Sequence, residues 1–202
     1  MKLLLISDVE SPALWDHYQP ERLQGIDAII SCGDLKAQYL EFLVTLSGKP
    51  LFYVPGNHDE AYLENPPGGC ECVDGHVVTF GGLRILGFGG CRFYKDGPYQ
   101  FTEEQMARRI RRARREIRKA GGIDLLVTHA AAEGYGDAPD HAHRGFACYR
   151  DLLDRYQPPY HIHGHVHQTY GWNIPRTLQY GPTTIINAFD RYVLELEVPP
   201  RP

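Results

Sequence analysis

Side chains that can bind metals or move protons recur directly after short apolar runs of this 202-residue chain. Asp8 and Glu10 follow the run that begins at Leu3. Residues two apart in an extended strand point the same way, so both carboxylates would face whatever lies beyond the end of that strand. The pair could hold a cation, or it could be a hydrated turn.

Four further apolar runs end in side chains of the same kind. The endings are Gly33-Asp34, Gly56-Asn57-His58-Asp59, His129 and Gly164-His165-Val166-His167. A single histidine after a strand is more often a hydrogen-bonded surface residue than a ligand. Five such endings indicate a site, because ligands gather beyond the carboxyl edge of the strands in open α/β sheets. Imidazole suits zinc and iron while carboxylate and amide oxygens suit harder ions, so the set fits a pair of divalent metals.

The elements that must position these residues alternate in the first half of the chain. Residues 3–7, 28–31 and 51–54 are predicted to be buried strands, with a helix within 35–46, which indicates β-α-β units and a largely parallel sheet. Gly81-Gly82 predicts a hairpin between strands at 76–80 and 83–88. Later elements are expected as strands at 123–128, 160–163, 168–172, 183–186 and 192–198, and as a short helix at 146–156.

Residues 103–119 are predicted to form an amphipathic helix. Thr102 and Gln105 have the spacing of a capping box, and Gly121-Gly122 ends the run. Apolar residues recur at helical spacing, namely Met106, Ile110, Ala113 and Ile117. From Arg108 to Lys119 the other faces carry seven Arg and one Lys against the single Glu116, in a chain whose formal net charge is -4. An Arg-rich face could bind nucleic acid, but a solvated helix face is the commoner explanation and the one we favour.

Composition is that of an ordinary globular protein, with 43% hydrophobic and 23% charged residues. We expect 1–202 to form a single domain with no membrane partner, because no apolar run approaches the roughly 18 residues of a membrane span. The five cysteines are odd in number and have no C-x-x-C spacing. They favour free thiols in a reducing compartment, and therefore a cytoplasmic location.

The motifs, in their order along the chain, resemble those of the calcineurin-like metallophosphoesterase superfamily. They are Asp8-x-Glu10, Gly33-Asp34, Gly56-Asn57-His58-Asp59, His129 and Gly164-His165-x-His167. The resemblance covers nearly the whole chain, and the combination is far more specific than any single motif. It implies an α/β fold, a four-layer α/β/β/α sandwich of two mixed sheets flanked by helices, in which the later strands build the second sheet.

The resemblance also implies a centre of two divalent metal ions, with Asp34 bridging them. Asp8 and His167 would complete one site. The other site would be completed by Asn57, His129 and His165.

By the same resemblance, His58 would act as proton donor, with Asp59 as a partner that orients it. Metal-activated hydroxide would hydrolyse a phosphomonoester or phosphodiester without a covalent enzyme intermediate. A phosphorylated small molecule or a nucleotide is the expected substrate.

Glu10 departs from the family, which usually has histidine at that position. A carboxylate is an acceptable ligand with a longer reach, and its charge favours a harder ion. Mn, Fe or Zn are candidates, with Mn or Fe favoured. Glu10 could bind a metal directly, contact it through water, or lie in a solvated turn, and we favour a metal contact.

A second class of function is a fold used as an interaction module with a weakened metal site, as in the retromer subunit of this superfamily. A decayed module should have lost several ligands or His58, whereas one position departs here. The enzyme is therefore favoured. A nuclease that uses the basic helix ranks below both.

Overall fold

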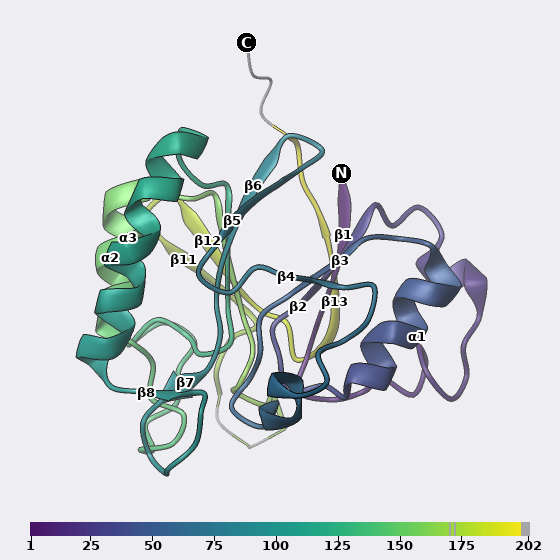
Figure 1. Ribbon diagram of the computed structural model, residues 1–202, viewed down its shortest axis with the longest axis horizontal. Helices are drawn as coiled ribbons and strands as arrows, with labels where there is room; N and C mark the ends of the chain where they lie inside the picture. The colour runs from purple at the N-terminus through teal and green to yellow at the C-terminus, as the bar shows by residue number, and fades with distance from the viewer. Residues whose placement is uncertain (170, 172, 199–202) are drawn as a thin grey trace.

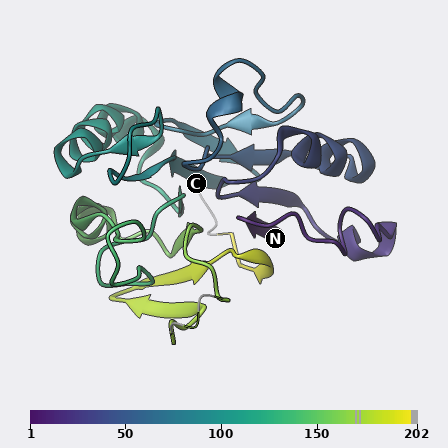
Figure 2. The same cartoon turned by 90° about the horizontal axis from the view of Figure 1, so that it is seen from below.

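The computed structural model describes residues 1–169, 171 and 173–198, which form a four-layer sandwich (Figure 1). A five-stranded sheet has the order β13-β1-β2-β3-β4, and a six-stranded sheet has the order β11-β12-β10-β9-β6-β5. Helix α1 (Ala37–Ser47) lies outside the first sheet, and α2 (Glu103–Ala120) and α3 (Ala147–Tyr156) lie outside the second (Figure 2). The expected α/β/β/α arrangement of two mixed sheets is confirmed.

The strands of the first sheet are β1 (Lys2–Ser7), β2 (Ala28–Ser31), β3 (Leu51–Tyr53), β4 (Glu71–Cys72) and β13 (Asp190–Glu195). Those of the second are β5 (Val77–Phe80), β6 (Leu83–Phe88), β9 (Leu125–Thr128), β10 (Tyr160–His163), β11 (Thr177–Tyr180) and β12 (Thr183–Asn187). A separate pair is formed by β7 (Cys91–Arg92) and β8 (Gln100–Phe101), and two 3-10 helices are η1 (Pro20–Leu23) and η2 (Glu60–Leu63).

Most central strands divide their side chains between two cores. Leu3 and Leu5 of β1 face the layer between the two sheets, whereas Leu4 and Ile6 face the layer that contains α1. Strand β9 divides its residues in the same way between the inter-sheet core and the core beneath α2 and α3. Burial of both faces explains why these strands are continuous apolar runs in the sequence.

The predicted parallel pairing and hairpin are found. Strands β1, β2 and β3 are parallel neighbours, and so are β6, β9, β10 and β12 in the second sheet. Strands β5 and β6 form the predicted antiparallel hairpin. In both sheets the parallel strands therefore deliver their carboxyl ends to one edge.

The prediction of a strand at 168–172 is wrong for the described residues of that range. Gln168 and Thr169 form a turn, and Gly171 has a φ of 78°, which an extended strand does not allow. Tyr170 and Trp172 lie outside the described residues. The edge strand of the second sheet is β11, which lies further along the chain and pairs with β12.

Helix α2 has the predicted capping box and apolar face. The backbone N–H of Gln105 donates to Thr102 Oγ1, and the backbone N–H of Thr102 donates to Gln105 Oε1. Its buried residues are Met106, Ile110, Ala113 and Ile117. No helix of the described part is long and apolar enough to span a bilayer. All five cysteines are described and unpaired, as predicted.

Replacement of Thr102 by alanine should lower the free energy of unfolding by about 1 kcal/mol, because it removes the acceptor for one N–H of the first turn of α2. Urea denaturation measures the change. Thr45→Ala is the matched control, since Thr45 is an exposed residue within α1 that is not a cap of this helix. An equal loss in both variants would contradict the capping role.

Candidate metal centre

The carboxyl ends of both sheets meet at one edge and are joined there by hydrogen bonds between residues of the two sheets. His129, directly after β9, has its ring Nδ1 2.7 Å from the carbonyl oxygen of Cys32, which follows β2. The backbone N–H of His165, after β10, donates to both carboxylate oxygens of Asp8 at 3.0 Å. Residues from four strand ends are therefore neighbours.

The glycines of these motifs allow an unusually close approach of the chain segments. A Cβ at Gly56 would lie 2.0 Å from Asp34 Oδ1, and one at Gly33 would lie 2.3 Å from the backbone nitrogen of Gly56. A Cβ at Gly164 would lie 1.9 Å from Ser7 Oγ. No side chain fits at these three positions, so glycine is required for the strand ends to come together.

Three of the predicted ligands adopt a left-handed backbone conformation. The φ angles are 67° at Asp8, 55° at Asp34 and 68° at His165. Such a conformation costs about 1–3 kcal/mol for a non-glycine residue and is held only where the surroundings fix it. Backbone hydrogen bonds do so here, for example from Asp8 N to the Gly33 carbonyl at 3.1 Å. The bends turn the side chains into a common hollow.

Hydrogen-bond acceptors face one another within the cluster of predicted ligands. A carbonyl only accepts, so the Cys32 carbonyl fixes the proton of neutral His129 on Nδ1 and leaves Nε2 as an acceptor. His129 Nε2 lies 2.9 Å from Asn57 Oδ1 and 3.4 Å from Asp34 Oδ2. Facing acceptors repel unless a proton or a cation lies between them. These acceptor atoms could therefore serve together as ligands of a metal ion.

His165 completes this group of ligands. Its Nε2 lies 2.9 Å from the carbonyl of Ala142, to which it donates, so Nδ1 remains as the ligand atom of the ring. Ligand atoms of Asp34, His129 and His165 all lie within 4.8 Å of one another. The Asn57 amide is oriented by its Nδ2, which donates to the hydroxyl of Tyr94 at 3.3 Å.

The electrostatics of the cluster favour a cation at the same place. Burial opposes the charge of His129, but Asp34 and Asp8 outweigh it and raise the pKa of His129 to about 9. Burial also opposes ionisation of Asp34, yet the charge of His129 and their hydrogen bond hold the pKa of Asp34 well below its usual range. Without metal, a proton on His129 thus supplies the positive charge that Asp34 requires.

Two other ligands have pKa values that burial moves strongly. Burial, with the nearby charge of Asp34, raises the pKa of Asp8 to about 7. Burial and the neighbouring His129 lower the pKa of His165 to about 3, so its ring is neutral and ready to bind metal.

Most of the predicted site residues line one hollow of about 440 Å³. Its walls are Asp8, Asp34, His58, Tyr94, Ala142, His143, His165 and His167. His167 Nε2 lies 4.0 Å from Asp8 Oδ1. His58 is exposed at the rim, and its backbone N–H donates to Asp34 Oδ1 at 2.8 Å.

Asp59 has backbone partners. Its Oδ2 accepts hydrogen bonds from the N–H groups of Asp34 (2.8 Å) and Gly56 (2.7 Å). Within the described residues no hydrogen bond joins its carboxylate to the His58 ring. The residue fixes the loops that carry Asp34 and His58, and orientation of the imidazole by Asp59 stays a prediction.

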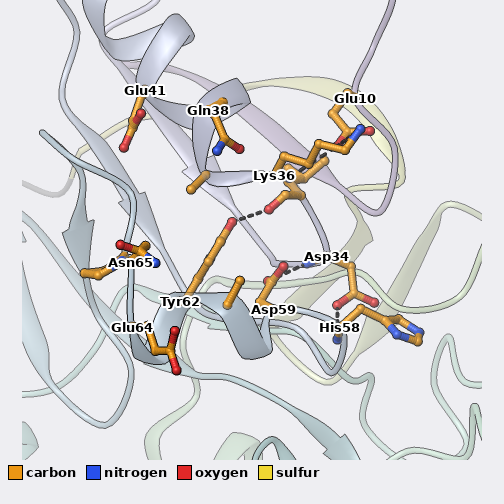
Figure 3. A pocket seen from close by; sticks show the side chains of 14 residues that line it. Glu10, Asp34, Lys36, Gln38, Glu41, His58, Asp59, Tyr62, Glu64 and Asn65 are labelled. Carbon is orange, nitrogen blue, oxygen red and sulfur yellow. Dashed lines mark hydrogen bonds and ion pairs between the residues drawn. The ribbon is translucent and has the colours of Figure 1, made fainter.

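Glu10 lies beside Lys36 and away from Asp34 and His58 (Figure 3), and it is not in the cluster of Asp34, His129 and His165. Its Oε1 accepts the backbone N–H of Lys36 at 3.2 Å and lies 3.8 Å from Lys36 Nζ. The expectation that Asp8 and Glu10 share a face fails because β1 ends at Ser7 and Asp8 bends the chain. Metal contact by Glu10 stays a prediction, to which this geometry adds no support.

Tyr94 and His143 are wall residues that the predicted ligand set does not include. His143 Nδ1 lies 2.9 Å from Asp140 Oδ1, and its ring centroid lies 4.9 Å from that of His165. Both residues come from long loops, whose side chains no periodicity places. Arg92 lies two residues before Tyr94 in sequence. It pairs with Glu133 and is not among the residues that line this hollow.

Comparison with known proteins agrees with the geometry. A family model described as calcineurin-like phosphoesterase matches residues 1–169. The UPF0046 protein K07C11.7 of Caenorhabditis elegans is 34% identical over 119 residues, which cover 57% of this chain and 34% of that protein. The UPF0046 protein T07D4.2 of the same organism is 30% identical over 107 residues, which cover 49% and 24%. The chain thus matches about a third or less of each relative.

A solved structure, that of TT1561 of Thermus thermophilus, has a similar fold. The TM-score is 0.62 at 15% identity, and the alignment covers 94% of this chain and 89% of that one. At this identity the likeness concerns the fold alone.

Metal binding should release protons and weaken as the pH falls. At pH 7.5 the metal-free protein carries a proton on His129, whose pKa is about 9, and a bound metal must displace it. Below about pH 7, Asp8 adds a second proton, so affinity should then fall by about tenfold per pH unit for each proton. Calorimetric Mn²⁺ titrations in buffers of different ionisation enthalpy count the protons. Zero proton release at pH 7.5 would contradict the assignment.

Replacement of Glu10 by histidine should raise the metal content of the purified protein. Histidine is usual at this position in the family that the motifs resemble, and it lacks the carboxylate that holds Glu10 against Lys36, so its ring can turn toward Asp8. Manganese per chain is measured by mass spectrometry after gel filtration, and Glu64→His is the control because Glu64 lies outside the ligand cluster. Equal metal content in wild type and Glu10→His would show that position 10 does not limit loading.

Proposed function

The chain belongs to the calcineurin-like phosphoesterase family, and we propose that it is a metal-dependent phosphoesterase that hydrolyses a phosphomonoester or a phosphodiester at a centre of two divalent ions. One observation carries the proposal: Asp34, Asn57 and His129 present converging acceptor atoms beside the exposed ring of His58. We take the substrate to be a phosphorylated small molecule or a nucleotide.

The ligand set divides into two groups around Asp34. Asn57, His129 and His165 would hold one ion with Asp34, and Asp8 and His167 would hold the second with the same carboxylate. Bound divalent ions, with Mn or Fe favoured, would supply Lewis acidity toward phosphoryl oxygens and lower the pKa of a coordinated water. The buried hydrogen bonds to the Cys32 and Ala142 carbonyls support the proposal, because they keep both imidazoles in the tautomer that binds a cation.

His58 is proposed to donate a proton to the leaving oxygen. Its ring is exposed at the rim, while its backbone is held by Asp34, so the imidazole can reach a substrate without leaving the centre. Imidazole is the side chain that most often transfers protons in catalysis, provided that it lies within hydrogen-bond reach of the reacting oxygen. Asp59 would act through the backbone, since its carboxylate accepts the N–H groups of Asp34 and Gly56 and so fixes the loops that carry Asp34 and His58.

The interaction module remains the second interpretation of this fold, and the geometry of the ligands argues against it. An unused centre would be free to lose its buried acceptors and its left-handed residues, both of which cost free energy of folding. This chain retains them at Asp34, His129 and His165.

His58→Ala should lower kcat by about 10²–10⁴-fold, because it removes the proton donor and leaves the ligands in place. The measurement is hydrolysis of p-nitrophenyl phosphate and bis-p-nitrophenyl phosphate by metal-stripped protein after Mn²⁺ is restored. Their ratio separates monoester from diester chemistry. His17→Ala is the matched control, because His17 is exposed and does not line the hollow at the metal ligands. Full activity in His58→Ala would remove His58 from the mechanism, and a folded protein that no metal activates would favour the interaction module.

A further inference from the structure

A second hollow of about 710 Å³ adjoins the metal centre (Figure 3). It lies between the first turns of α1 and the 3-10 helix η2, and Lys36, Gln38, Tyr62, Glu64 and Asn65 are among its walls. This volume falls within the range of about 300–1,000 Å³ that small-molecule sites occupy. Its size alone permits an organic group to bind.

The two hollows meet at the residues that would carry out the reaction. Asp34 and His58 line both of them. A phosphoryl group at the metal ligands would place its leaving oxygen near His58. The rest of the leaving group can then extend past His58 into the larger hollow.

We propose, on the basis of the phosphoesterase function proposed above, that the hollow between α1 and η2 is the leaving-group subsite and that it selects neutral or cationic alcohols over anionic ones. Its floor is apolar, since Leu35 and Tyr62 are 2% and 7% exposed. The Tyr62 hydroxyl is already used, because it donates to the Leu35 carbonyl. The body of the leaving group would therefore pack on the Tyr62 ring.

Charge in the outer part of the hollow opposes a second anion. Three carboxylates line this part, from Glu10, Glu41 and Glu64, against one ammonium group of Lys36. Lys36 Nζ is 3.8 Å from Glu10, which offsets its charge. Within the described residues, no hydrogen bond or ion pair engages the Glu64 carboxylate. A cationic group on the substrate would find its counter-charge there.

The first turn of α1 does not reverse this preference. A helix N-terminus attracts anions through its free N–H groups and its dipole. Here the Glu10 carboxylate already accepts the N–H of Lys36, the residue that precedes α1. A protein carboxylate is thus already bound at the N-cap of α1, where its charge repels an anionic leaving group. This gives Glu10 a position in the subsite.

The test compares two phosphomonoesters of similar size whose leaving groups differ in charge, O-phosphoethanolamine and 2-phosphoglycolate. The Mn²⁺-loaded wild type should show a kcat/KM ratio of roughly tenfold in favour of the amine, because a net negative wall attracts one leaving group and repels the other. Glu64→Lys should lower this ratio by roughly fivefold or more, and Lys36→Gln should raise it.

Glu60→Lys is the matched control. It makes the same charge change at the first residue of η2, whose C-cap is Glu64, but Glu60 does not line the hollow and lies beside Gly97. The control should keep the wild-type ratio and the wild-type rate on p-nitrophenyl phosphate.

Two failures are distinguishable. Turnover of p-nitrophenyl phosphate with a charge ratio that Glu64→Lys and Glu60→Lys leave equally unchanged would overturn the subsite alone. A wild type that hydrolyses none of the three esters, nor bis-p-nitrophenyl phosphate, with any metal would overturn the proposed function, and the subsite with it.

Discussion

The hydrogen bond between the His129 ring and the Cys32 carbonyl is the contact on which the centre depends. It joins the second sheet to the first, buries the imidazole completely, and fixes which nitrogen faces the hollow. Because Nε2 then points at Asp34 and Asn57, the folded chain has a set of acceptors that requires a positive charge. In the absence of metal, a proton on His129 supplies this charge at neutral pH, because Asp34 and Asp8 raise the pKa of His129 to about 9 despite its burial. The hydrogen bond that joins the two sheets therefore also orients His129 for binding a metal ion.

The sandwich stabilises this local arrangement. Left-handed Asp8, Asp34 and His165, and the glycines that permit contact between the strand ends, would be unfavourable in an isolated loop. They persist because each follows a buried parallel strand, whose two faces pack against separate cores. The packed layers fix the ends of the strands, and the ends fix the ligands. The two hollows that meet at His58 are the space left open at this edge.

Much of the architecture could be predicted from the sequence, for physical reasons that differ between elements. The capping box and apolar spacing of α2 are local signals, and both are confirmed. Strand β11 is not evident in the sequence because its residues alternate at a half-exposed edge, while the aromatic residues near Gly171 give a false signal. The prediction that Glu10 shares the face of Asp8 assumes an extended chain, and a single positive φ removes that premise. Contacts such as Asn57 with Tyr94, or His165 with Ala142, join residues far apart in the sequence and depend on loop conformation, which no periodicity encodes.

The most direct measurement is the anomalous scattering of crystals of the full chain soaked with Mn²⁺. The geometry predicts a strong peak within ligand distance of Asp34 Oδ2, Asn57 Oδ1, His129 Nε2 and His165 Nδ1, with the Cys32 and Ala142 carbonyls still accepting from the two rings. Peaks confined to other places, for instance beside Glu10 and Lys36, would contradict it. So would an ion that is bound only after His129 has turned away from Cys32.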